Sequence, residues 1–128
     1  MSFLFAIVLS QAVAAPVDCG KAITQMDMNR CAGDDFAAAD AALNAQWEVT
    51  AADMRERDAL TQSLDDGHPG YFAQLLAAQR AWLAFRDAHC ASACYAARGG
   101  SMEPMLVAMC RTQLTRLRTS QLQDLIEP

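Results

Sequence analysis

The sequence predicts an all-α fold: a small antiparallel bundle of three main helices and a short N-terminal helix, stapled by disulfides. Apolar residues recur at three- and four-residue steps along most of the chain, which is typical of amphipathic helices. No stretch shows the alternation of apolar and polar residues that a strand requires. Five cysteines in only 128 residues are typical of small exported domains that contain disulfides.

The N-terminus has the pattern of a secretory signal peptide. Residues Met1–Leu9 are apolar apart from Ser2, and Ala12–Ala14 is a small-x-small cleavage pattern. We expect cleavage after residue 14, which leaves residues 15–128 as a single domain of an exported protein. A short N-terminal anchor is the alternative, but so short an apolar run spans a bilayer poorly.

The first part of the domain predicts a short helix followed by a long one. Thr24, with Asp27 three residues later, resembles a capping box that starts a helix over Gln25–Cys31. The run Gly33–Asp35 is expected to break or kink this helix, so that a second helix begins there and fades near Leu64. The residues that recur at helical spacing along the second helix are Phe36, Asp40, Leu43, Trp47, Thr50 and Met54.

Two further helices follow a linker. The run Asp65–Gly70 contains the Gly and Pro residues that stop a helix. The next helix is expected from Tyr71 to about Arg98, and the last from about Ser101, with Pro104 tolerated in its first turn. Across the bundle, the side chains expected to form the apolar core are Phe36, Leu43, Trp47, Trp82, Leu83, Leu114 and Leu117.

The stretch Gln79–Cys90 combines a strong helical pattern with a tryptophan, two arginines and a cysteine. Gln79 and Arg86 lie in its apolar stripe, and polar groups there need partners because an unpaired buried charge costs several kcal/mol. Antiparallel packing that gathers the cysteines at one end also brings Asp40 within reach of Arg86. We expect a structural polar network that fixes the helix register, made by Asp40, Gln79, Arg86 and Arg118.

Short connections make neighbouring helices antiparallel, so the cysteines should gather at one end of the bundle. We favour the pairs Cys19 with Cys31 and Cys90 with Cys110, each of which stabilises the fold by roughly 3 kcal/mol in the chain-entropy treatment. A Cys31–Cys90 crosslink is the main rival. Cys94 is left unpaired, as a free thiol, an intermolecular bridge or an alternative partner for Cys110.

No motif in the sequence indicates an enzyme. The chain has no Gly-rich phosphate loop, HExxH or GxSxG, and adjacent side chains such as His89 and Cys90 point in different directions on a helix. A metal site of His89, Cys90 and Cys94 is a weaker alternative, because methionines at helical steps usually fill a core. The methionines that would add soft ligands suited to copper are Met102, Met105 and Met109. We expect no metal and no cofactor.

The net charge of −5 is unevenly distributed. Residues 18–66 carry eleven acids and four bases, whereas residues 67–128 carry six bases and four acids. An acidic chain binds nucleic acid poorly. It is instead steered towards a basic partner.

The surface most typical of a binding site is a tight loop at the cysteine-rich end. A rigidly held, exposed loop is where binding proteins often place their contacts. The simpler interpretation is that its two glycines only make the turn. The residues of this candidate partner-binding loop are Arg98, Gly99, Gly100, Ser101, Met102 and Glu103.

Several segments of the chain share the pattern of a known family. They are Asp18-Cys19, Met28–Ala32, Ala39–Asn44, Gln79–Cys90, Gly99–Met102 and Cys110. Over essentially the whole mature chain, this pattern resembles the lysozyme inhibitor LprI-like N-terminal domain family, formerly a domain of unknown function. The family's namesake is a lysozyme-inhibiting lipoprotein. This chain departs from it, because residues 16–18 form no lipobox before Cys19 and because Cys94 is an additional cysteine.

The resemblance implies an exported bacterial helical domain without enzymatic activity, with lysozyme inhibition as the family-level expectation. A basic lysozyme would suit the acidic chain, and Arg98 or Ser101 would be suitable donors to the carboxylates of a lysozyme cleft. The alternative function is a structural or adaptor module of the cell envelope, which binds another protein or peptidoglycan.

Overall fold

The computed structural model describes residues 15–62 and 65–127. The predicted signal peptide, residues 1–14, lies outside the described residues. The described chain forms three α-helices, and no strand occurs within it. The three helices are α1 (Gln25–Leu60), α2 (Tyr71–Ala93) and α3 (Glu103–Asp124). The all-α prediction is therefore confirmed.

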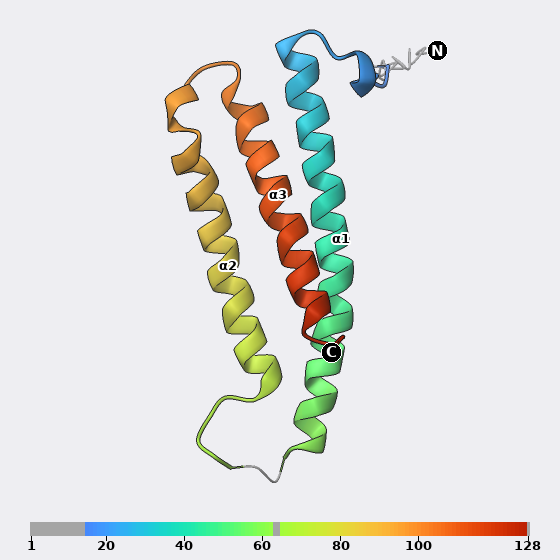
Figure 1. Cartoon of the computed structure of the whole chain (residues 1–128), viewed down its shortest axis with the longest axis vertical. Coiled ribbons are helices and arrows are strands. Elements are labelled where there is room, and N and C mark those ends of the chain that lie inside the picture. Colours follow the sequence, from blue (N-terminus) through green and yellow to red (C-terminus); the bar gives the residue numbers. More distant parts are fainter. Residues whose placement is uncertain (1–14, 63–64, 128) are drawn as a thin grey trace, which may run out of the picture.

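Two short 3-10 helices accompany the main helices: η1 (Cys19–Lys21) in the N-terminal lead and η2 (Tyr95–Ala97) after α2. Neighbouring helices in the chain are antiparallel, and α1 and α3 begin at the same end of the bundle (Figure 1). The contact between α1 and α3 is by far the most extensive, and α2 packs more sparsely on both. No described helix has the combination of length and apolar character needed to cross a membrane.

The helix α1 is continuous over 36 residues, so the predicted break at Gly33–Asp35 is wrong. Thr24 is the N-cap, and its hydroxyl accepts a hydrogen bond from the Asp27 N–H at 3.1 Å. The predicted short helix is thus the first part of α1. One glycine costs a helix interior only about 1 kcal/mol, and extensive packing against α3 outweighs that cost.

Gly33→Ala is expected to raise the free energy of unfolding by about 0.5–1 kcal/mol. An alanine Cβ at this exposed position would meet no atom within 4 Å, and alanine restricts the unfolded chain more than glycine does. Urea unfolding followed by circular dichroism measures the change.

Gly70→Ala is the matched control, with the opposite sign expected. Its Cβ would lie 2.7 Å from Asp58 Oδ1. That carboxylate caps α2, because Oδ1 accepts from the Tyr71 N–H at 2.6 Å and Oδ2 from the Phe72 N–H at 3.0 Å. Loss of such a cap costs about 1 kcal/mol. A destabilised Gly33→Ala variant would show that α1 needs glycine at that point.

The other helix boundaries differ slightly from the predictions. The helix α2 ends at Ala93, short of the predicted Arg98, because the chain tightens after Cys94 into the 3-10 turn η2. The helix α3 begins at Glu103, with Met102 as N-cap and Pro104 in its first turn.

The buried apolar cluster consists of Leu43, Met54, Leu75 and Leu122. Of the predicted core, Leu43 is buried, and the half-buried residues are Phe36, Trp47, Trp82 and Leu114. The prediction is wrong for Leu83 and Leu117, which are 38% and 56% exposed. Helices α2 and α3 bury only narrow stripes, and polar side chains take several of those positions. These polar residues are Gln79 and Arg86 on α2 and Thr112 and Thr115 on α3.

Candidate functional site

The paired cysteines gather at the end of the bundle where α1 begins, α2 ends and α3 begins (Figure 1). Cys19 is bonded to Cys31 and Cys90 to Cys110, with Cα–Cα distances of 5.7 and 5.6 Å. Both favoured pairings are confirmed, and the rival Cys31–Cys90 crosslink is excluded. These bonds join the N-terminal lead to α1 and α2 to α3.

Cys94 is a half-buried free thiol. It lines a groove of about 420 Å³ together with Leu106 and Cys110. The weaker metal alternative needed Cys90 as a thiolate ligand, but that sulfur is held in a disulfide. In the part of the chain that the structure describes, no group of three or more His, Cys, Asp and Glu residues is arranged to hold a metal ion.

The candidate loop, residues 98–103, is held by hydrogen bonds within its own turn and by a hydrogen bond from α1. Gly99 adopts φ +77°, a left-handed conformation that favours glycine, and its N–H donates to Glu103 Oε2 at 2.7 Å. On the side facing α1, Asn29 Nδ2 donates to the Ser101 carbonyl oxygen at 2.9 Å. Gln25 Nε2 in turn donates to Asn29 Oδ1 at 2.8 Å. The loop is therefore held by α1 as well as by its own turn.

The loop presents a charged group on an aromatic support. Arg98 is exposed, and its guanidinium carbon lies 5.3 Å from the ring centroid of Tyr95, which is also exposed. Met102 adds an exposed apolar side chain. At the same end, Ile23, just before the Thr24 cap, and Met26, in the first turn of α1, are exposed, and neither was predicted as a binding residue. The sequence feature that could have identified them is the pair of apolar residues on either side of the Thr24–Gln25 helix start.

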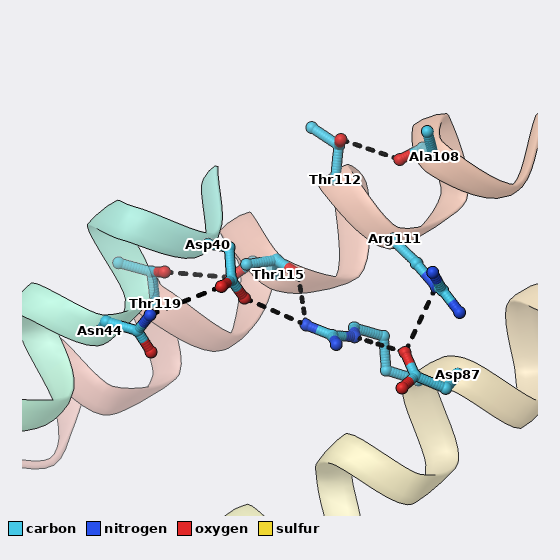
Figure 2. Close-up of polar contacts among 9 residues, drawn as sticks. Asp40, Asn44, Asp87, Ala108, Arg111, Thr112, Thr115 and Thr119 are labelled. Atoms are coloured by element: carbon cyan, nitrogen blue, oxygen red, sulfur yellow. Dashed lines mark hydrogen bonds and ion pairs between the residues drawn. The ribbon is translucent and has the colours of Figure 1, made fainter. Parts of the chain in front are cut away.

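Arg86 is the centre of an interior polar network. Figure 2 shows its partners Asp40, Asp87 and Thr115. It is only 7% exposed. Its Nη1 lies 3.4 Å from Asp40 Oδ1 and 3.3 Å from Thr115 Oγ1, and its Nε donates to Asp87 Oδ1 at 3.0 Å. Its guanidinium carbon also lies 5.2 Å from the ring centroids of Phe36 and Trp82. Protein groups from all three helices thus surround this arginine.

Three members of this network, Asp87, Arg111 and Thr115, were not predicted. Asp87 also lies 3.3 Å from Arg111 Nε, so it bridges two arginines from α2 and α3 (Figure 2). Thr115 is fully buried on α3 and contacts Arg86 directly. Asp87 directly follows Arg86 in the sequence, and this adjacency could have indicated the contact between them. The network links the three helices around a buried arginine, so it is a structural contact and not an accessible binding site.

Gln79 and Arg118 form a separate pair instead of completing the Arg86 network. Arg118 Nε donates to Gln79 Oε1 at 2.9 Å, and Nη1 donates to Gln121 Oε1 at 3.3 Å. Burial lowers the pKa of Arg118 from its ordinary value, because desolvation penalises the charged form. The four residues predicted as one network therefore lie in two sets.

The family model described as "Lysozyme inhibitor LprI" matches residues 18–122, which include both disulfides, the Gln79–Cys90 segment and the loop at residues 98–103. The chain is 47% identical over 110 residues to an uncharacterised protein of Rhizobium meliloti (strain 1021), an alignment that covers 86% of this chain and 79% of that protein. No solved structure matches the chain. The chain belongs to the lysozyme inhibitor LprI family.

Proposed function

We propose that this chain is an exported, non-enzymatic binding protein that inhibits a lysozyme, with the loop at residues 98–103 as its contact surface. Membership in the lysozyme inhibitor LprI family is the single observation that supports this function most strongly. The two disulfides support an oxidising compartment, the periplasm or the cell exterior. The signal-peptide pattern of residues 1–14 supports the same location.

The charge of the chain favours a basic enzyme as the partner. The net charge is −5 at neutral pH. Lysozymes of the common animal type are basic, so opposite charges would accelerate their encounter with this chain at low salt. Added salt should slow this association, since the screening length falls to about 3 Å at 1 M.

The loop supplies a donor suited to a glycosidase cleft. Glycoside hydrolases place two carboxyl groups on either side of the scissile bond. The exposed guanidinium of Arg98 can donate two parallel hydrogen bonds to one carboxylate, a geometry that is strong and specific. Because the Asn29 contact to Ser101 and the turn at Gly99 hold the loop before binding, little ordering entropy is lost on association.

Arg98→Ala is the variant that tests this proposal. The oxidised parent protein at micromolar concentration should slow the lysis of bacterial cell walls by a basic animal-type lysozyme. A lost hydrogen bond to a charged group costs about 1.5–3 kcal/mol, so Arg98→Ala should weaken inhibition about 10- to 100-fold. The inhibition constant is the quantity to compare.

Arg80→Ala is the matched control, because Arg80 is an exposed arginine on α2 and its replacement changes the net charge equally. It should change the inhibition constant less than twofold. Equal inhibition by the parent and Arg98→Ala would reject the loop as the contact surface. Undiminished lysis in the presence of micromolar parent would reject inhibition of that lysozyme.

The second candidate function is an adaptor module of the cell envelope. The exposed Ile23 and Met26 at the loop end favour a protein partner with an apolar contact area. Immobilised oxidised protein would then retain an envelope protein or peptidoglycan and no lysozyme. Loss of that retention in Met26→Ser, with the helical signal unchanged, would favour the adaptor function over inhibition.

A further inference from the structure

A second surface lies far from the loop, where the later part of α1, the start of α2 and the end of α3 meet. It is a groove of about 390 Å³, a size typical of small-molecule sites. Its floor is made by Met54 and Leu75, which are buried. Its rim includes Tyr71 and Leu125, which are exposed. The groove therefore combines an apolar floor with an uncovered apolar rim.

Two arginines line the groove, and their surroundings differ. Arg57 Nε lies 2.6 Å from Asp53 Oδ2, so its charge is balanced within α1. Arg57 Nη2 also lies 3.3 Å from the Leu125 carbonyl oxygen. Arg118 has only the neutral side-chain oxygens of Gln79 and Gln121 as partners.

Among residues 15–62 and 65–127, no carboxylate lies within 4.0 Å of the Arg118 guanidinium. A half-buried guanidinium without a counter-charge is poorly solvated, and a bound carboxylate would restore the lost interaction. The groove thus has one uncompensated positive charge beside apolar side chains.

We propose that this groove binds a free anionic amphiphile, a medium-chain carboxylate whose head group pairs with Arg118. Its alkyl chain lies over Met54 and Leu75 and covers the exposed rim at Leu125. Charge complementarity selects the anion over a neutral or cationic amphiphile of the same length. This activity is independent of lysozyme inhibition, because the loop at residues 98–103 lies at the other end of the bundle (Figure 1).

Isothermal titration calorimetry with decanoate below its micellar concentration tests the proposal on the oxidised protein. The parent should bind one decanoate with a submillimolar Kd. Decanol and decyltrimethylammonium should each bind at least tenfold more weakly. Arg118→Gln should weaken decanoate binding at least tenfold, whereas Arg118→Lys, which keeps the charge, should lose less.

Arg116→Gln is the matched control, because Arg116 is an exposed arginine on α3 and its replacement removes the same charge. It should change the decanoate Kd less than twofold. Absence of decanoate binding to the parent, or equal binding of decanol, would overturn the proposal. The comparison of ligands uses the parent alone, so it decides the question even if Arg118→Gln does not fold.

A membrane surface offers the same combination of anion and alkyl chain. Sedimentation with phosphatidylglycerol vesicles distinguishes the two sources. Pelleting that depends on Arg118, in a protein that does not bind free decanoate, would overturn the assignment to a free amphiphile. Absence of such pelleting, with decanoate bound, would support it.

Discussion

Replacing Cys90 and Cys110 together with alanine is expected to lower the free energy of unfolding by about 3–5 kcal/mol. Their disulfide has a sequence separation of 20 residues, and Cys90 is fully buried. The bond joins α2 to α3, and α2 is the helix that packs most sparsely on the bundle. Urea unfolding of the oxidised double variant, followed by circular dichroism, measures the loss.

The double replacement of Cys19 and Cys31 with alanine is the matched control. This disulfide ties only the N-terminal lead to α1, and the lead includes no buried residue from Cys19 to Lys21. Removing this bond raises the conformational entropy of the N-terminal lead in the native state as well as that of the unfolded chain. The free energy of unfolding therefore falls less than for the Cys90–Cys110 bond. We expect a loss below about 1.5 kcal/mol. Equal losses in the two double variants would contradict this assignment of roles.

Arg86→Ala is expected to lower the free energy of unfolding by about 2–4 kcal/mol. The substitution removes a buried guanidinium that contacts Asp40, Asp87 and Thr115. Breaking a fully buried ion pair costs about 3–5 kcal/mol. The expected value is lower, because the Asp40 and Asp87 side chains are 40% and 49% exposed and water can solvate them. Urea unfolding again gives the measured quantity.

Two further variants provide reference values for the free energy of unfolding of Arg86→Ala. Arg80→Ala removes an exposed arginine from the same helix and should cost less than about 0.5 kcal/mol. Asp40→Ala should cost about 1 kcal/mol, because its contact with Arg86 is long, at 3.4 Å, and half-exposed. If Arg86→Ala unfolds at the same urea concentration as Arg80→Ala, the interior network contributes no stability.

The helical class was predictable because it depends on local pattern. The disulfides were predictable because short connections make neighbouring helices antiparallel and so gather the cysteines at one end. The cap at Thr24 depends on a few adjacent residues, Thr24 to Asp27. The continuity of α1 through Gly33 was not predictable in this way. It depends on how far α3 packs along α1, and only the folded bundle shows that. Helix packing also explains why Leu83 and Leu117 are exposed although they were predicted in the core. Their helices bury narrower stripes than the apolar patterns indicate.

The interior site was partly predictable. Asp40 and Arg86 drew attention because each interrupts an apolar stripe, and the structure places them 3.4 Å apart. Thr115 looks unremarkable in sequence, and its contact with Arg86 joins residues 29 positions apart. The Asp58 cap of α2 likewise connects two helices across a linker. Such contacts follow from the relative placement of helices, which a single sequence does not specify.

The Gln79–Cys90 segment, the most distinctive motif of the chain, contributes mainly to the scaffold. Arg86 joins three helices, Gln79 pairs with Arg118, and Cys90 is bonded to α3. Partner binding is proposed instead at residues 98–103, immediately beyond η2. Rigid support by a stable scaffold reduces the entropic cost of binding through a loop.

Amide hydrogen exchange of the oxidised protein, with and without a basic animal-type lysozyme, tests this division most directly. We predict that lysozyme slows exchange at residues 98–103 and leaves exchange within residues 79–90 unchanged. Slower exchange within residues 79–90 with no change at residues 98–103 would contradict the account, because the binding surface would then lie on the segment that we assign to the scaffold.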